Sequence, residues 1–202
     1  MKFETNYQPD FSQRDPAEGV DKSIFRRWSP RSLKKIEIPE EILTAIIDAA
    51  RWSPSCFNEQ PWLFLTSSSR EDFDLFLRLL VERNQQWAKN ASVLGFFITR
   101  RNFADRDKEN RWGKFDTGAA WMAMTVQANK FGLYTHGMAG VNFPEVYKQL
   151  EIPEDEFDVI CAFAIGAIDT PDQLPSDDFI DKEVPSGRKP LSEVWLKGKF
   201  KR

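Results

Sequence analysis

The sequence predicts one α/β or α+β domain in which a β-sheet is sandwiched by helices. The chain has 202 residues, a length typical of a single domain. Apolar residues make up 41% of it and charged residues 29%, which is the balance of a folded globular protein. Segments with helical periodicity interleave with short apolar runs that are rich in β-formers.

Helices are predicted where apolar residues recur every three or four positions. The clearest helix begins at Pro39, carries Ile42 and Ile46 on its apolar face, and ends before Ser53. Four others are expected, at residues 17–28, 71–82, 115–131 and 144–150. The segment 115–131 is apolar on nearly all sides, which predicts burial in a large core or against another subunit.

Strands are predicted at four apolar runs, residues 62–66, 92–99, 133–141 and 157–168. Residues 1–16 contain two prolines and many polar groups, so we expect a weakly ordered N-terminal arm there. Residues 17–202 are then expected to form a single domain.

Composition excludes several functions. A net charge of −3 gives no basic field for nucleic acid or an anionic membrane. Apolar runs such as 93–98 are far shorter than the roughly 20 residues that span a bilayer. One histidine and two cysteines predict no metal site and no disulfide framework, and they favour a cytoplasmic protein. If the chain is an enzyme, a bound cofactor is expected to carry the chemistry.

Charge is distributed unevenly along the chain. Segment 21–35 carries six basic residues and one acidic residue, a net charge of +5, and residues 184–202 also carry +5. Between them, residues 151–183 carry eleven acidic residues and one basic residue, a net charge of −10. The two basic segments could meet around an anion, or both could be solvated surface.

The run Arg26–Arg31 is suited to binding phosphate. It places three guanidinium groups and the Ser29 hydroxyl where a helix is expected to give way to a turn, and Pro30 restricts the backbone. The alternative is an ordinary basic helix C-terminus, which the helix dipole favours.

A second polar segment, residues 53–62, lies between the clearest helix and a strand. Pro54 and Pro61 stiffen it, while Ser55, Asn58 and Gln60 offer amide and hydroxyl groups. Such a loop suits the edge of a flat heteroaromatic ring, but it also suits a connection whose side chains bind their own backbone.

With these two segments the chain resembles the FMN-dependent nitroreductase family. Residues 27–31, 38–42 and 49–62 carry the first part of the resemblance. Further similar segments follow in the family's order over roughly residues 20–195, namely Asn84 with Trp87, 116–119, 132–133, 138–140, 152–153, 164–166 and 188–191.

The resemblance implies an α+β three-layer sandwich with a mostly antiparallel sheet, and a homodimer with FMN at the subunit interface. By position, Arg27, the backbone of Trp28 and Ser29 would hold the phosphate and ribityl end, while Arg31 would approach the N1/O2 edge of the ring. The other implied cofactor-binding residues are Pro54, Ser55, Cys56 and Asn58 from the partner subunit, Asn84, Met138, Ala139, Gly140, Arg188 and Lys189.

The implied activity is transfer of a hydride from NADH or NADPH through flavin N5 to a small acceptor by a ping-pong mechanism. A nitroaromatic, a quinone or an enone would be such an acceptor. No side chain acts as a nucleophile or general base in this scheme, and Arg31 is the implied N1/O2 stabiliser. The alternative is a flavin-binding or flavin-processing protein of the same fold without general reductase turnover.

The sequence departs from the family where acceptor preference is set. Many relatives have a second cation at the position of Trp87, and residues 100–114, where relatives build part of a lid, are short and highly charged. His136 lies just before the implied flavin-facing amides, and a structural role is favoured over a catalytic one. For Cys56, packing is favoured over redox activity because no resolving cysteine is nearby.

Overall fold

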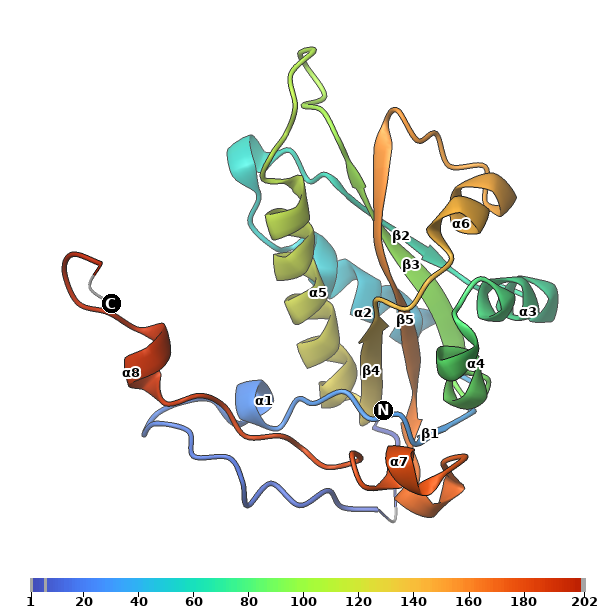
Figure 1. Cartoon of the computed structure of the whole chain (residues 1–202), viewed down its shortest axis with the longest axis vertical. Helices are drawn as coiled ribbons and strands as arrows, with labels where there is room; N and C mark the ends of the chain where they lie inside the picture. The colour runs from blue at the N-terminus through green and yellow to red at the C-terminus, as the bar shows by residue number, and fades with distance from the viewer. Residues whose placement is uncertain (1, 6, 201–202) are drawn as a thin grey trace.

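The computed structural model describes residues 2–5 and 7–200. It has three layers (Figure 1). Helices α2 (Glu40–Arg51) and α5 (Gly113–Lys130) cover one face of the sheet, and α3 (Arg70–Arg78), α4 (Glu82–Ala88) and α6 (Phe143–Gln149) cover the other. Two hydrophobic cores fill the spaces between the layers, one on each face. The α+β sandwich is therefore confirmed.

The sheet is antiparallel in every pairing among the described residues. Its central strand β5 (Phe157–Ile168) pairs with β3, β4 and β1, and β3 pairs with the edge strand β2. The other bounds are β1 Leu33–Lys34, β2 Trp62–Thr66, β3 Val93–Arg100 and β4 Leu133–Met138. Four strands occupy the predicted segments; β1 was not predicted.

Helices α2 and α5 pack side by side beneath the sheet, where Ile46, Ala50, Met124 and Ala128 are fully buried. The chain alone buries one face of α5 and leaves another exposed, so burial in its own core is wrong for the exposed face, and burial against another subunit stays a prediction. Phe115 is 73% exposed and Met122 is also exposed, because no part of the described chain covers that face of α5.

The opposite layer contains α3 (Arg70–Arg78), α4 (Glu82–Ala88) and α6 (Phe143–Gln149). The helix predicted over 71–82 is confirmed at its start, but it ends at Arg78 and a separate helix begins at Glu82. The chain leaves the helix after Leu79 because the backbone pairs elsewhere: the Val81 amide donates to the Gly140 carbonyl at 3.1 Å. A Leu80–Val141 β-bridge lies in the same contact, which also ends β4 before residue 141.

The predicted helix over 17–28 is reduced to α1, Lys22–Phe25. Gly19 adopts a positive φ of 86°, which breaks a helix, and Asp21 then caps the short helix through the Ser23 amide at 2.8 Å. The described residues before α1 form no helix or strand. The start of this segment is bonded to the body, because the Phe3 amide donates to the Phe131 carbonyl at 2.7 Å.

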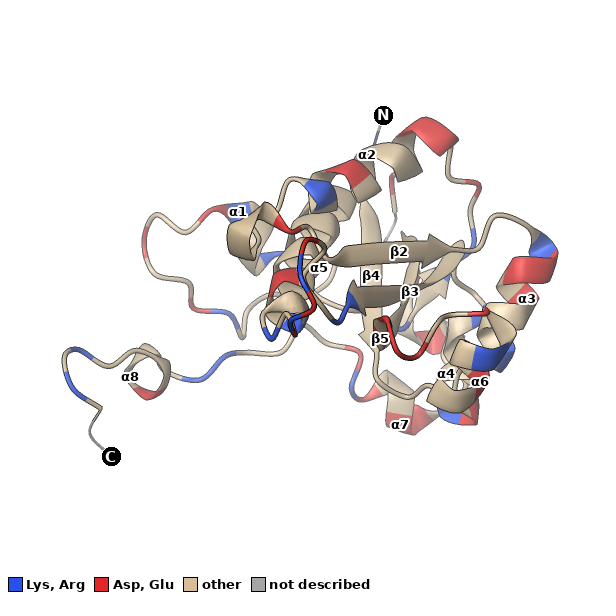
Figure 2. Ribbon diagram, turned by 90° about the horizontal axis from the view of Figure 1, so that it is seen from above, with Lys and Arg blue, Asp and Glu red and all other residues tan. Residues whose placement is uncertain are grey.

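After α7 (Asp177–Ile180) the chain first runs along the body, where Glu183 and Pro185 are buried, and it then projects away with α8 (Leu191–Val194) (Figure 1). Most charged residues of the projecting segment are Lys or Arg, marked blue in Figure 2. Two short 3₁₀ turns, η1 (Cys56–Asn58) and η2 (Pro171–Gln173), complete the elements. Among the residues described, we find no helix with the length and apolar character needed to span a membrane.

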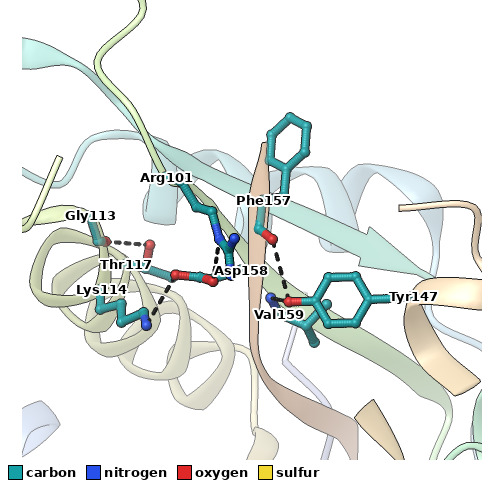
Figure 3. A network of polar contacts seen from close by, with 8 residues as sticks. All are labelled: Arg101, Gly113, Lys114, Thr117, Tyr147, Phe157, Asp158 and Val159. Carbon is teal, nitrogen blue, oxygen red and sulfur yellow. Dashed lines mark hydrogen bonds and ion pairs between the residues drawn. The ribbon is translucent and has the colours of Figure 1, made fainter. Parts of the chain in front are cut away.

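A polar network joins three elements at the end of the sheet near the start of α5. Asp158 on β5 accepts from Arg101 at 2.7 Å and from Lys114 of α5 at 3.0 Å (Figure 3). On the other side of β5 the Tyr147 hydroxyl accepts from the Val159 amide at 2.9 Å. The network holds β5, α5 and the segment after β3 together.

Candidate functional site

The turn over residues 27–32 links α1 to β1. The indole of Trp28 is buried and anchors the turn in the body. The neighbouring side chains of Arg27 and Ser29 are only half-buried. Arg27 donates to the Ser29 hydroxyl at 3.1 Å. The two groups predicted to bind phosphate are therefore already side by side.

Three guanidinium groups meet at this turn. Arg14 donates to the carbonyls of Arg27 at 2.8 Å and of Ser186 at 3.1 Å, which brings the N-terminal segment and the start of the tail together. Burial lowers the pKa of Arg14 to about 10, and repulsion from Arg188 and Arg27 adds to the effect. Burial and then Arg188 lower the pKa of Arg27.

None of these three arginines forms an ion pair within the described part of the chain. Like charges held together without an acid are unfavourable, and a bound anion would relieve the repulsion. The cluster of Arg14, Arg27 and Arg188 thus has the chemistry of a phosphate site.

The end of β4 lies next to the same turn. His136 Nδ1 is 3.0 Å from the Pro30 carbonyl oxygen; because a carbonyl only accepts, Nδ1 must carry the proton. Burial, followed by the charge of Arg31, lowers the pKa of His136 to about 4. A neutral imidazole therefore ties β4 to the turn that carries Arg31.

Beyond His136 the chain leaves the sheet at Ala139 and Gly140. Asn84 on α4 donates to the Gly140 carbonyl at 3.1 Å. Neither the Ala139 nor the Gly140 amide has a hydrogen-bond acceptor among residues 2–5 and 7–200, and Ala139 is exposed. A Cβ on Gly140 would lie 2.6 Å from the Asn84 amide nitrogen, so this close approach requires glycine.

The loop over residues 54–58 lies elsewhere. The Cys56 amide donates to Asp116 in the first turn of α5 at 3.1 Å, whereas α1 packs near the other end of that helix (Figure 1). An 18-residue helix is about 27 Å long, so one chain cannot bring this loop to its own basic turn.

The same loop has a strained backbone. Phe57, Asn58 and Gln60 all have positive φ, at 54°, 60° and 49°. Each such residue costs on the order of 1 kcal/mol, and this strain concentrates at functional sites. The Ser55 hydroxyl helps to hold the shape by accepting from the Gln60 amide at 2.9 Å.

The structure thus brings most of the predicted site residues together and separates five of them. Around the turn and the end of β4 lie Arg27, Trp28, Ser29, Arg31, Asn84, Met138, Ala139, Gly140 and Arg188. Pro54, Ser55, Cys56 and Asn58 lie at the far end of α5. Lys189 extends along the tail, 3.9 Å from Glu193. Met138 is buried within the sheet, where it pairs with Ala162.

One residue at this site gave no signal in the sequence. Glu183 lies within an acidic stretch, yet its carboxylate is buried and bonded to the turn through the Arg31 and Ser32 amides. Its partners are more than 150 positions away, so only the fold reveals it. No group of acids, histidines and cysteines that could hold a metal ion occurs among the described residues.

The fold is an α+β sandwich with a mostly antiparallel sheet, and a cluster of three arginines meets at one turn of it. The model of the nitroreductase family matches residues 24–167, and the chain belongs to this family.

Three relatives show how close the similarity is. A crystal structure described as an oxidoreductase containing FMN is 40% identical, with a TM-score of 0.87, and the match covers 93% of this chain and 96% of that one. A protein from Exiguobacterium sibiricum, solved with FMN, is 18% identical over 92% of this chain and all of its own, with a TM-score of 0.72; it supports the fold alone. A Methanothermobacter thermautotrophicus protein, provisionally named NADH dehydrogenase/NAD(P)H nitroreductase, is 40% identical over 52 residues, 26% of this chain and 27% of that protein.

Proposed function

We propose that this protein is an FMN-dependent oxidoreductase that takes a hydride from NADH or NADPH and passes it to a small acceptor. The observation that carries the proposal is the cluster of Arg14, Arg27 and Arg188, which has no acidic partner in the described chain. The turn with this cluster is joined through His136 to β4, and the free Ala139 and Gly140 amides follow that strand. The 40% identity to a protein described as containing FMN supports the same cofactor.

The residues present fit FMN. Arg27, the Trp28 backbone, Ser29 and Arg188 would hold the phosphate and ribityl end, with Lys189 available from the tail. Arg31 would stabilise negative charge at the N1/O2 edge, Asn84 would bind the pyrimidine edge, and the Ala139 and Gly140 amides would donate to the ring. Bound FMN would supply the hydride chemistry at N5 by a ping-pong mechanism.

We further propose that the active form is a homodimer. The chain exposes 12445 Å², about a quarter more than the roughly 9,800 Å² typical of a compact monomer of this mass. Part of the excess is apolar surface on α5 and on the tail, where Trp195 is 61% exposed. In a dimer, Pro54, Ser55, Cys56 and Asn58 would reach the partner's turn, which they cannot reach in their own chain.

The acceptor would enter beside the loop that holds Phe57. The Phe57 and Phe103 rings meet edge to face at 6.1 Å between centroids, and the Arg106 guanidinium lies 4.2 Å from the centre of the Phe103 ring. This aromatic wall suits a planar acceptor such as a nitroaromatic, a quinone or an enone.

Residues 17–202 would form a single domain, preceded by the arm of residues 1–16. The free thiols of Cys56 and Cys161 suit a reducing compartment such as the cytoplasm.

Spectroscopy of the purified protein tests the proposal. We expect a yellow protein that releases one FMN per chain on denaturation and oxidises NADH or NADPH when a quinone or nitroaromatic is present. Sedimentation should give twice the chain mass of 23.5 kDa. A colourless protein that takes up no added FMN would rule the proposal out.

One observation favours a second candidate, a flavin-binding protein without general turnover. Trp87 stands where many relatives have a second cation, and its ring is buried against His136, so Arg31 is left as the cation at the ring edge. Anaerobic mixing with each nicotinamide separates the two candidates. Bleaching of the flavin within seconds supports the reductase, whereas stable colour supports the binding protein.

A further inference from the structure

Glu183 is a buried acid that the proposed chemistry does not use. It follows α7, its amide donates to the Ile180 carbonyl at 3.0 Å, and its side chain is 1% exposed. One carboxylate oxygen, Oε1, accepts three hydrogen bonds, from the Arg31 amide at 2.6 Å, the Ser32 amide at 2.7 Å and the Ser32 hydroxyl at 2.8 Å.

This carboxylate has no cation to balance it. It takes part in none of the ion pairs of the described chain, and its second oxygen, Oε2, has no hydrogen-bond partner there. Burying a charge without a counter-ion is costly, and three donors on one oxygen offset that cost only while the turn keeps its shape. A buried amide or apolar side chain would avoid this cost. The presence of a carboxylate therefore indicates that the turn needs a strong acceptor for its three donors.

The backbone beside Glu183 is held tightly. The Leu33 amide donates to the Arg31 carbonyl at 2.8 Å, so both peptide groups of Arg31 are bonded. His136 holds the preceding carbonyl, that of Pro30, from the β4 side. Three residues after Glu183 comes Ser186, whose carbonyl accepts from Arg14 within the basic cluster.

We propose that Glu183 is a positioning residue for the flavin site: its Oε1 fixes the Arg31 and Ser32 backbone, and thereby the direction of the Arg31 guanidinium. The same contact anchors the start of the tail that carries Arg188 beside Arg27. The inference rests on the proposed function, since it assigns what the bonds to the turn are for.

Two substitutions separate the hydrogen bonds from the charge. Glu183→Gln removes the charge and keeps an oxygen that can accept from the turn, whereas Glu183→Ala removes both. Both variants lack the charge, so a difference between them reports the hydrogen bonds together with the volume of the side chain. We expect FMN to bind at least tenfold more weakly to Glu183→Ala than to Glu183→Gln, and its reduction potential to be more negative in the Ala variant.

Hydrogen exchange of the apoprotein tests whether Glu183 fixes the backbone of the turn when no flavin is bound. Hydrogen exchange over residues 29–33 should be at least tenfold faster in Glu183→Ala than in Glu183→Gln. Asp158→Ala is the matched control, because it removes a carboxylate with several partners at the other end of β5 (Figure 3). We expect it to lower stability while leaving FMN affinity, flavin potential and exchange at the turn unchanged.

The outcomes are distinct. If wild type binds FMN and the Ala and Gln variants agree in affinity, potential and exchange, Glu183 is not a positioning residue. If wild type binds no FMN, the proposed function fails, and hydrogen exchange alone still decides whether Glu183 holds the turn. Should Glu183→Ala not fold, Ser32→Ala, which deletes one donor, replaces it; an FMN affinity equal to that of wild type would then overturn the inference.

Discussion

The rings of His136 and Trp87 lie with their centroids 4.7 Å apart, and the other side of the imidazole is bonded to the Pro30 carbonyl. The contact joins α4, β4 and the basic turn through one neutral side chain. Because the imidazole is buried next to Arg31, protonating it is unfavourable, and its pKa falls to about 4.

The first prediction concerns stability and pH. In the unfolded chain His136 has its ordinary pKa of about 6.5, so between pH 6.5 and 4 the unfolded state binds the extra proton. The free energy of unfolding should therefore decrease as the pH falls through this window, by up to about 3 kcal/mol from this residue. Urea titrations at pH 7, 5.5 and 4.5 measure it.

His136→Gln is the control for that prediction. His136 is the single histidine of the chain, and the carboxylates titrate alike in both proteins. The difference in stability between wild type and variant should therefore be constant above pH 7 and should shrink as the pH falls. A difference that does not depend on pH would show that the imidazole is not held neutral.

A second prediction concerns the phosphate. Arg27→Ala removes a charge-assisted hydrogen bond worth about 1.5–3 kcal/mol, so the Kd for FMN should increase roughly 10- to 100-fold. Arg26→Ala removes the same charge from an exposed neighbour and should change the affinity by less than about threefold. Flavin fluorescence titration measures both, and equal effects would mean that only net charge matters.

The third prediction concerns the ring edge. Arg31→Ala should make the reduction potential of bound FMN more negative and slow hydride uptake, because a fixed cation stabilises charge that develops at N1/O2. Arg31→Lys keeps the charge without the planar fork and should recover part of the potential. Equilibration with reference dyes gives the potential, and an unaltered value in the Ala variant would remove Arg31 from this role.

The fourth prediction tests the close approach at the end of β4. In Gly140→Ala the new methyl group would lie 2.6 Å from Asn84 and 2.7 Å from Val81, so the apoprotein should lose about 1–3 kcal/mol of stability. Gly137→Ala, on the same strand, meets nothing closer than 3.4 Å and should be nearly neutral. Thermal unfolding compares them; equal melting temperatures would contradict the packing described.

The fifth prediction concerns assembly. Removing residues 190–202 deletes much of the exposed apolar surface, including Trp195 and Phe200. We expect the truncated chain to sediment as a monomer and to retain FMN poorly. A truncated chain that remains a dimer with full FMN content would exclude the tail from the interface.

Much of the fold could be predicted from local pattern. The runs 62–66 and 157–168 became strands with the expected bounds, because dense β-branched and aromatic residues between polar ends leave few alternatives. The break between α3 and α4 could not be predicted, because it follows from pairing of Leu80 with Val141, which is distant in sequence. Strand β1 has two residues, too few for any periodicity.

Part of the candidate site could likewise be predicted from the sequence, and part depends on contacts between distant residues. Arg27 and Ser29 belong to a local motif, so the sequence alone suggested them, whereas Asn84 was suggested only by the resemblance to the family. The roles of Glu183 and His136 depend on partners more than a hundred positions away, the Arg31 amide and the Pro30 carbonyl. Burial and backbone geometry, rather than residue type, identify such groups.

Because the strained loop and the basic turn lie at opposite ends of α5, each cofactor pocket of the proposed dimer would draw its two halves from different chains. Two proteins that bind FMN weakly, one substituted at Arg27 and the other at Asn58, should then complement each other when mixed and refolded. Every mixed pair would contain one doubly damaged pocket and one intact pocket, so half of its sites would recover.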